Sequence, residues 1–408
     1  MIAMQRIRLV GVGRTAIGAL KRDSIDLARE ALALAFAEAN ITAKDVGALI
    51  ATPSLSSGHF MQAHYLGTKF QLTAANPEML FKTVDTGGAS PVSSIGAALD
   101  LFRRMPRLNV AVVVSSDAVH TLPSSEFAKR SNESIPSPYL AEPHIPHGYD
   151  FYAQWQMKQY GLKREQLAMV PVLMSAMSAR HPDAMCRKRY SLEEVLGARQ
   201  IAPVTNLPEC ARRADGAVAI VLAREEHYKQ HIATGPLDGR RPYILGVGEA
   251  SGPLYPPATH EEVTPETFSC HRSMRLAYEA AGGLSASDID FFGLYDCFPI
   301  CFIRALEGAG LCREGEGGQM VEEAYNKAVQ RGGDVDQSEF PINTHGGLMC
   351  FGAPWEVPAM YNVAEAVAQL GAQAGPRQIH PTPRRALVYG NGGVFSASAV
   401  AILGTDTP

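Results

Sequence analysis

The chain has 408 residues, of which 46% are hydrophobic and 19% charged, and its formal net charge is −4. This composition excludes global disorder, and the slightly acidic balance gives no basic surface for nucleic acid. The length suggests two to three domains or one large α/β unit. No apolar run approaches the roughly 18 residues of a transmembrane helix, and the N-terminal residues lack a signal-peptide pattern. The seven cysteines follow no disulfide spacing, so we expect a cytoplasmic protein.

The elements predicted along the first part of the chain begin with a buried strand at residues 9–13 that runs into a glycine turn. A helix with apolar residues at helical spacing follows over about 24–39 and leads into a strand at 46–50. Two glycines, Gly87 and Gly88, precede a helix over about 91–105. A strand at 110–114 comes next, and a last strand at 218–222 closes this part of the chain.

The second part of the chain repeats these features in the same order. A strand at 244–248, a helix at 274–281, a Gly-Gly pair at 346–347, a helix at 357–370 and strands at 386–389 and 399–403 follow one another. Any α/β protein shows some alternation of this kind, but the matched order of six features favours a duplication. We therefore predict two halves, residues 1–240 and 241–408.

The first half has one segment without a counterpart, residues 117–215. We predict a helical insertion that lies over the core, where it could cover a substrate. Residues 144–147 within it, which include His144, are predicted to form a loop. His144 is a candidate substrate contact, and simple surface placement is the alternative.

The chain resembles the thiolase superfamily, and most of all its sterol-carrier-protein-type thiolases and thiolase-like relatives. The segments that carry this resemblance lie in family order at residues 11–15, 210–217, 295–298, 343–347 and 389–393. The resemblance implies the α/β thiolase fold: duplicated βαβαβαββ halves in a five-layered α-β-α-β-α arrangement, with a helical loop-domain insertion in the first half. It also implies a coenzyme A thioester as substrate and no other bound cofactor.

The nucleophilic cysteine of true thiolases is missing from this chain. In the family it stands at the N-terminus of the helix that follows the Gly-Gly segment, where the helix dipole lowers the pKa of the thiol. Gly88 occupies that position here, and no cysteine precedes Cys186. Ser90 could substitute as a nucleophile, but a Ser followed by Pro91 is typical of a helix N-cap with proline at the next position. A side-chain-free turn at Gly87 and Gly88 would leave room for a bulky substrate.

Two family histidines are replaced as well. Tyr295 stands where the family usually has the histidine of its His-Asp-Cys-Phe motif, and Ala353 replaces the acid/base histidine. A tyrosine hydroxyl can donate to an oxyanion or, if its pKa is lowered, accept a proton, although Tyr295 could also serve packing alone. A further set should converge near Tyr295 by pseudo-symmetry: His345, which could instead be a core histidine, and Cys350, Cys297, Asn391, Gly392 and Gly393. Cys297 and Cys301 lack further ligands at zinc spacing, so no metal site is expected.

The residues that remain favour a carbon–carbon lyase over a thiolase. Retro-aldol cleavage of a β-hydroxyacyl-CoA needs a base and donors to the enolate, but no covalent acyl intermediate. The resemblance extends to thiolase-like aldolases that shorten steroid or similar side chains and release acetyl-CoA or propionyl-CoA, with Tyr295 as a catalytic group; we expect His345 to share proton transfer with it. It also implies a homodimer and a small acyl-CoA-binding partner with an OB fold and zinc ribbon. The alternatives are an acyltransferase that uses Cys350 or Cys297 and a non-catalytic acyl-CoA-binding subunit.

Overall fold

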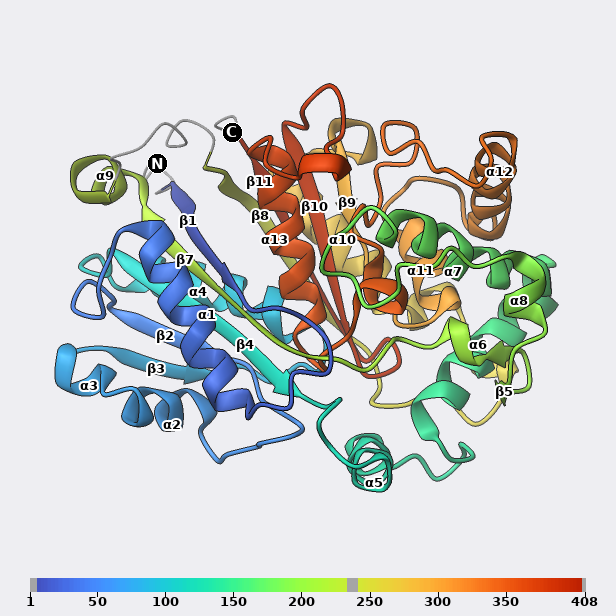
Figure 1. The fold of residues 1–408 in the computed structure, drawn as a ribbon, viewed down its shortest axis with the longest axis horizontal. Helices are drawn as coiled ribbons and strands as arrows, with labels where there is room; N and C mark the ends of the chain where they lie inside the picture. The colour runs from blue at the N-terminus through green and yellow to red at the C-terminus, as the bar shows by residue number, and fades with distance from the viewer. Residues whose placement is uncertain (1–5, 233–240, 406–408) are drawn as a thin grey trace.

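The computed structural model describes residues 6–232 and 241–405, and a mixed sheet of nine strands runs through them (Figure 1). Its order is β3-β2-β4-β7-β1-β8-β11-β10-β9. The strands of the first half are β1 (Ile7–Arg14), β2 (Ala48–Ala51), β3 (Leu80–Thr83), β4 (Val110–Ala118) and β7 (Asp215–Arg224). Those of the second half are β8 (Tyr243–Ser251), β9 (Phe291–Gly293), β10 (Arg385–Gly392) and β11 (Ala397–Gly404).

The two halves repeat one topology about the junction of β1 and β8. Outward from this junction, β1-β7-β4-β2 matches β8-β11-β10-β9, and the first two pairings are antiparallel and the third parallel on both sides. β3 pairs in parallel with β2, and a parallel bridge between Phe292 and Ile342 takes the same place beside β9. The predicted duplication is therefore confirmed. Residue 240, the predicted end of the first half, lies outside the described residues.

Helices cover both faces of each half and also fill the space between the halves. α1 (Ser24–Ala39) packs on the outer face of the first half, and α10 (Ser269–Ala280) packs on β8 and β11. α4 (Ser90–Arg104) contacts strands of both halves, and so does α13 (Pro358–Leu370), so these two helices form the central layer. The remaining helices of the two halves are α2 (Gln62–Lys69), α3 (Leu72–Ala75), α9 (Glu225–His227), α11 (Pro299–Gly308) and α12 (Gly317–Gln330).

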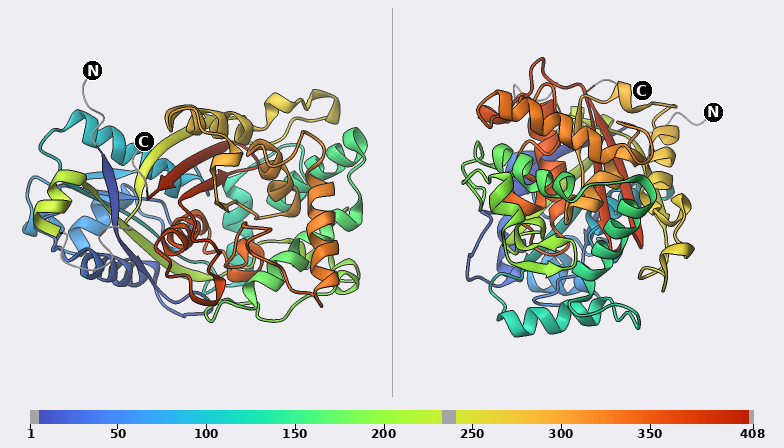
Figure 2. Two further views of the ribbon diagram at one scale, coloured as in Figure 1. Left: turned by 90° about the horizontal axis from the view of Figure 1, so that it is seen from above. Right: turned by 90° about the vertical axis from the view of Figure 1, so that its right-hand side faces the viewer.

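The insertion is helical, as predicted, and gathers with α12 at one end of the molecule (Figures 1 and 2). It contains α5 (Ser124–Ser134), α6 (His144–Tyr160), α7 (Arg164–Ser178) and α8 (Leu192–Leu196), followed by the short strands β5 (Gln200–Ala202) and β6 (Thr205–Asn206). The prediction of a loop at residues 144–147 was wrong, because these residues form the first turn of α6. Within residues 6–232 and 241–405, none of the helices combines the length and apolar character that crossing a bilayer requires.

The glycines at the start of each half serve close packing rather than a turn. Gly11 and Gly13 lie inside β1, and a Cβ on Gly13 would clash with the Ala31 carbonyl oxygen and approach the Cβ of Leu34 to 2.9 Å. Gly248 in β8 meets the backbone of α10 in the same way. The expected glycine turn is therefore corrected: these residues let a helix backbone lie directly against the strand.

Gly13→Val should lower the free energy of unfolding by about 2 kcal/mol or more, because its side chain would enter the backbone of α1. Denaturant titration followed by circular dichroism measures this change. Leu34→Ala, a substitution of a 44% exposed side chain on the same helix, is the control and should change stability by about 0.5 kcal/mol or less. Equal effects of the two variants would contradict the packing role of Gly13.

Candidate functional site

Three segments that are distant in sequence meet at the N-terminus of α4. They are residues 86–89, the turn between β10 and β11, and Tyr295, which follows β9. A Cβ on Gly87 would lie 2.9 Å from the Cα of Gly392, and one on Gly392 would clash with the carbonyl oxygen of Thr86. The two glycine-rich turns thus touch through their backbones, and we refer to this junction, with Tyr295, as the Gly88–Tyr295 site.

The hydroxyl of Tyr295 occupies the space that a side chain at position 88 would need. A Cβ built on Gly88 would clash with Tyr295 Oη and with the carbonyl oxygen of Asn391, and would lie 2.7 Å from Tyr295 Cζ. Gly88 itself is half-buried, whereas Tyr295 is only 5% exposed. The expectation that Gly87 and Gly88 leave room for a bulky substrate is therefore corrected, because the tyrosine ring fills the space over Gly88.

Asn343 holds the chain that presents Tyr295. Its side chain accepts a hydrogen bond from the Leu294 N–H at 2.8 Å and donates one to the Leu294 carbonyl at 2.8 Å. Asn343 adopts a φ of 48°, a left-handed conformation that asparagine tolerates better than most residues. Both the N–H and the carbonyl of Leu294 are thus hydrogen-bonded, which fixes the direction of the backbone at Tyr295.

Tyr295 is a hydrogen-bond donor and not a base. Burial raises its pKa well above the usual value, and the neighbouring Cys297 and Cys301 raise it further. The possibility that its pKa is lowered, so that it could accept a proton, is therefore excluded by its surroundings. A protonated phenol aimed at the helix N-terminus can stabilise an oxyanion.

The β10–β11 turn is held by a tyrosine that the sequence did not single out, Tyr149 of α6. The Tyr149 hydroxyl donates to the Gly393 carbonyl at 2.7 Å and accepts from Asn391 Nδ2 at 2.7 Å, while Tyr389 donates to Asn391 Oδ1 at 2.8 Å. The side chain of Asn391 is therefore occupied by two tyrosines, and the residue presents its backbone carbonyl to Gly88. Tyr149 connects the insertion to the site.

Two buried carboxyl groups flank Tyr295. Asp296 Oδ1 accepts from the Leu348 N–H at 2.8 Å, its Oδ2 has no partner in the described part of the chain, and burial raises its pKa to about 7. Glu356, just before α13, likewise has an unpartnered Oε2 among the described residues, and burial raises its pKa well above the usual value. Its side chain faces that of Ser90, and its negative charge raises the pKa of Tyr295. Asp296 could have been noticed in sequence because it adjoins Tyr295, but Glu356 follows no recognisable signal.

The segment 210–217 holds its neighbouring segments together through backbone hydrogen bonds. The Ala211 N–H donates to the Cys297 carbonyl at 2.9 Å, and the Arg212 N–H donates to the Leu348 carbonyl at 3.1 Å. The Arg212 carbonyl in turn accepts from the Ala353 N–H at 2.7 Å. These bonds tie together the segments that carry Tyr295 and Ala353, and Ala353, at the family's histidine position, contributes no acid or base.

His345 and Cys350 lie away from Tyr295. His345 lines a separate cavity with His181 and contacts the ring of Phe351, and burial lowers its pKa to about 4. Cys350 is fully buried in the π-helical turn η7 (Gly347–Phe351). Its free thiol faces the Pro171 carbonyl at 3.8 Å and lies near the free thiol of Cys186, and burial raises its pKa. The predicted convergence on Tyr295 is thus corrected for these two residues. Asp296 takes the position nearest η7 because its side chain, not that of Tyr295, faces this turn.

The three remaining candidates also have defined places. Cys297 lies beside the Gly88–Tyr295 site, between Tyr149 and Cys301. The backbone N–H of His144 donates to Asn132 Oδ1 at 3.1 Å, so His144 joins α6 to α5 instead of entering the site. Ser90 is the first residue of α4 and not its N-cap, which is Ala89; its hydroxyl accepts from the Thr86 N–H at 2.8 Å and so fixes the glycine turn.

Comparisons with known proteins identify the fold. A family model, the thiolase C-terminal domain-like family, matches residues 257–405. The acetyl-CoA acetyltransferase of Methanothermobacter thermautotrophicus is 26% identical over 98% of this chain and 99% of its own, and Bos taurus sterol carrier protein 2 is 27% identical over 97% and 72%. The solved Ltp2-ChsH2(DUF35) aldolase superposes with a TM-score of 0.79 and 21% identity over 99% of both chains. The predicted thiolase fold is confirmed.

Gly88 and Tyr295 should be energetically coupled. Gly88→Ala should lower the free energy of unfolding by about 1–3 kcal/mol, because its methyl group displaces the tyrosine hydroxyl. In a Tyr295→Ala background the same substitution should cost at least about 1 kcal/mol less. Denaturant titration of the double-mutant cycle measures this difference. A parallel cycle with the exposed Tyr139→Ala should be additive, and additivity at Tyr295 would contradict the contact.

The buried Asp296 should make stability depend on pH. Its folded pKa of about 7 lies above the usual 3.8, so between these values the folded state holds a proton that the unfolded state has lost. The free energy of unfolding should therefore fall as pH rises from about 4 to about 7, by up to about 1.4 kcal/mol per unit. Asp296→Asn keeps the acceptor for Leu348 and should make the slope shallower in denaturant titrations across that range, by up to about 1.4 kcal/mol per pH unit. Parallel curves for both proteins would show that Asp296 is not the source.

Proposed function

The chain belongs to the thiolase superfamily, in its sterol-carrier-protein-2-type subgroup, and from this premise we propose that it acts on acyl-CoA thioesters as a carbon–carbon lyase. The proposed reaction is retro-aldol cleavage of a bulky β-hydroxyacyl-CoA to a ketone and acetyl-CoA or propionyl-CoA. The coenzyme A thioester is the substrate, and no further cofactor is part of the proposal. The aldolase among the structural relatives supports this class of reaction.

One observation carries the proposal: the Tyr295 hydroxyl fills the place where a nucleophilic side chain at position 88 would begin. Acyl transfer through a covalent intermediate needs a nucleophile at that point, whereas retro-aldol cleavage needs a donor there. When the Cα–Cβ bond breaks, its electron pair moves into the thioester and places negative charge on the carbonyl oxygen. A phenol that stays protonated through burial is suited to receive that oxygen.

We assign the proton transfer to Glu356 in place of His345. Cleavage removes a proton from the β-hydroxyl and adds one at Cα, so one group that takes and returns the same proton balances the reaction. Glu356 acts electrostatically on Tyr295, its side chain faces that of Ser90 beside the glycine turn, and burial raises its pKa well above the usual value, which makes the carboxylate a stronger base. His345 lies in another cavity, with a pKa of about 4.

The partners are also part of the proposal. We propose a homodimer that pairs through β3, which forms the edge of the nine-stranded sheet and lies near the exposed side chains of Phe60 (94%) and Met61 (45%). Exposed apolar side chains beside an edge strand favour association. The two-component name of the Ltp2-ChsH2(DUF35) aldolase supports a second partner, which we propose to be an acyl-CoA-binding protein with an OB fold and zinc ribbon. A cytoplasmic location remains a prediction.

Two alternatives remain within the same family. An acyltransferase is favoured by the acetyl-CoA acetyltransferase among the relatives, and would use Cys297 or Cys350. Against it, Cys350 is fully buried and burial raises its pKa, which suppresses the thiolate. A non-catalytic acyl-CoA-binding subunit would keep the fold without turnover.

Tyr295→Phe should lower kcat by about 100-fold to 1,000-fold, the usual cost of losing one oxyanion donor. The assay supplies a tertiary β-hydroxyacyl-CoA to the purified protein, alone and with its co-purifying partner, and detects ketone and short acyl-CoA by mass spectrometry. Tyr139→Phe, at an exposed tyrosine of the insertion, is the matched control and should keep full activity.

Other outcomes would distinguish the alternatives. Full turnover by Tyr295→Phe would remove the tyrosine from the mechanism. An acyl adduct on Cys297 or Cys350, found by peptide mass spectrometry after mixing with an acyl-CoA, would establish the acyltransferase. Calorimetric binding of acyl-CoA without turnover in either form would indicate the non-catalytic subunit.

A further inference from the structure

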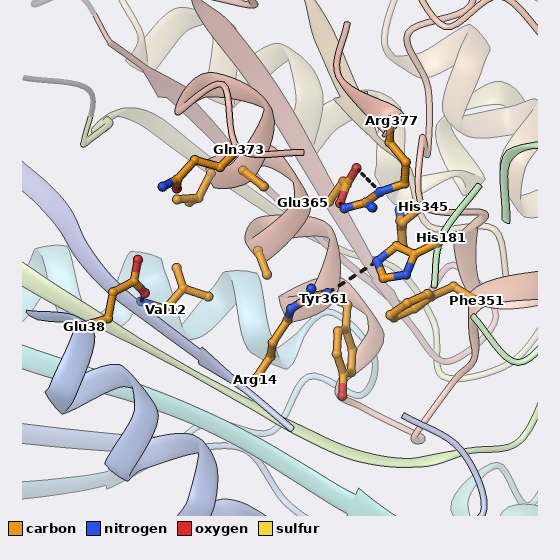
Figure 3. A pocket seen from close by; sticks show the side chains of 13 residues that line it. Val12, Arg14, Glu38, His181, His345, Phe351, Tyr361, Glu365, Gln373 and Arg377 are labelled. Atoms are coloured by element: carbon orange, nitrogen blue, oxygen red, sulfur yellow. Dashed lines mark hydrogen bonds and ion pairs between the residues drawn. The ribbon is translucent and has the colours of Figure 1, made fainter. Parts of the chain in front are cut away.

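A second cavity lies between β1, α13 and the segment that follows α7, apart from the Gly88–Tyr295 site (Figure 3). Its volume is about 190 Å³, and its polar lining includes Arg14, His181, His345, Glu365 and Arg377. One water needs roughly 10–15 Å³ of such space, so the cavity has room for a polyatomic ligand. The Gly88–Tyr295 site contributes no residue to it.

Two hydrogen-bond donors face each other in this cavity. His181 Nδ1 accepts from the Asp183 N–H at 3.0 Å, and burial lowers the pKa of His181 to about 3, so the neutral ring carries its proton on Nε2. Nε2 lies 3.4 Å from Arg14 Nη1, which is also a donor. Figure 3 shows these two side chains pointing toward one another. Neither group can accept from the other, so both lack an acceptor along this line.

The carboxylates that line the cavity are already engaged. Glu365 accepts from Arg377 Nε at 3.1 Å and Nη2 at 3.0 Å, and also from the Thr344 hydroxyl. Glu38 accepts from Arg241 at 2.6 Å and from the Val12 N–H at 2.5 Å. Among the described residues, Arg14 pairs with the half-exposed carboxylate of Asp183 through Nη2, at 3.6 Å, whereas its Nη1 is directed at His181 Nε2.

A buried histidine of the same cavity also lacks a hydrogen-bond partner among the described residues. His345 lines the same cavity, is 3% exposed, and its Nδ1 has no partner among the residues that the structure describes. Burial keeps its ring neutral at pH 7, as it does for His181. A polar ring held away from water without its full set of hydrogen bonds destabilises the fold unless a ligand or water completes it.

We propose that this cavity binds a small oxyanion, a carboxylate or phosphate group, between Arg14 Nη1 and His181 Nε2. An oxyanion offers several acceptor lone pairs in a small volume, so one bound group can satisfy both donors at once. Arg14 supplies the charge, and the neutral His181 supplies a donor of fixed direction. This site is independent of the proposed function, because none of its residues belongs to the Gly88–Tyr295 site.

Calorimetric titration of the full chain with inorganic phosphate and, separately, with acetate at constant ionic strength tests the proposal. We expect saturable binding of at least one of them, weakened about tenfold or more in Arg14→Gln, which removes a charged donor. Arg22→Gln is the matched control: its side chain is 42% exposed, against 41% for Arg14, it is also paired with a carboxylate, and it lies outside the cavity. This variant should bind as the wild type does.

Comparing phosphate with acetate shows which chemical group the cavity binds. Binding of phosphate alone would indicate a phosphate group, and binding of both would indicate any small oxyanion. Binding of neither, or equal binding by wild type and Arg14→Gln, would overturn the proposal. A second variant, His181→Phe, keeps a ring of similar shape without its donor; undiminished binding by this variant, with a wild-type circular dichroism spectrum, would also overturn it.

Discussion

The site depends on a steric exclusion between two positions 207 residues apart in the chain. A Cβ atom at position 88 and the hydroxyl of Tyr295 would occupy the same space, so only one of them can be present. The glycine is therefore more than the absence of a nucleophile. It is the condition under which a tyrosine can reach the N-terminus of α4, where the positive end of the helix dipole favours negative charge. The absence of a side chain at position 88 and the placement of the Tyr295 hydroxyl therefore depend on each other.

The duplication explains why these positions meet at all. α4 and α13 occupy equivalent places in the two halves and form the central layer, so the segments that precede them, 86–89 and 343–357, approach the same region from opposite sides. The segment 210–217 fastens this arrangement, because its backbone bonds hold both Cys297 and Ala353. Chemistry is therefore concentrated where the pseudo-symmetric halves join, on short connections supported by rigid strands.

Sequence patterns predicted the fold well because burial imposes periodicity. The strands, the central helices and the helical insertion follow from alternating or helically spaced apolar residues, and the duplication follows from their order. The site was predictable only at positions where the family's catalytic residues usually stand, as Gly88 and Tyr295 do. His345 and Cys350 were misplaced because neighbouring residues on one segment point in different directions: His345 lines a separate cavity, and Cys350 is buried against the Pro171 carbonyl. Tyr149 and Glu356 carry no local signal; long-range packing alone brings them to the site.

Burial gives the Gly88–Tyr295 site and the Arg14–His181 cavity opposite chemical characters. At the Gly88–Tyr295 site, burial raises the pKa values of Tyr295, Asp296 and Glu356, so the phenol stays protonated and the carboxylates become stronger proton acceptors. In the Arg14–His181 cavity, burial lowers the pKa values of two histidines, so this region presents neutral rings and one arginine charge. Desolvation disfavours every charged form, and the kind of group it acts on decides the outcome. A protonated phenol beside a basic carboxylate therefore suits enolate stabilisation and proton transfer, whereas imidazoles beside an arginine suit recognition of an anion without chemistry.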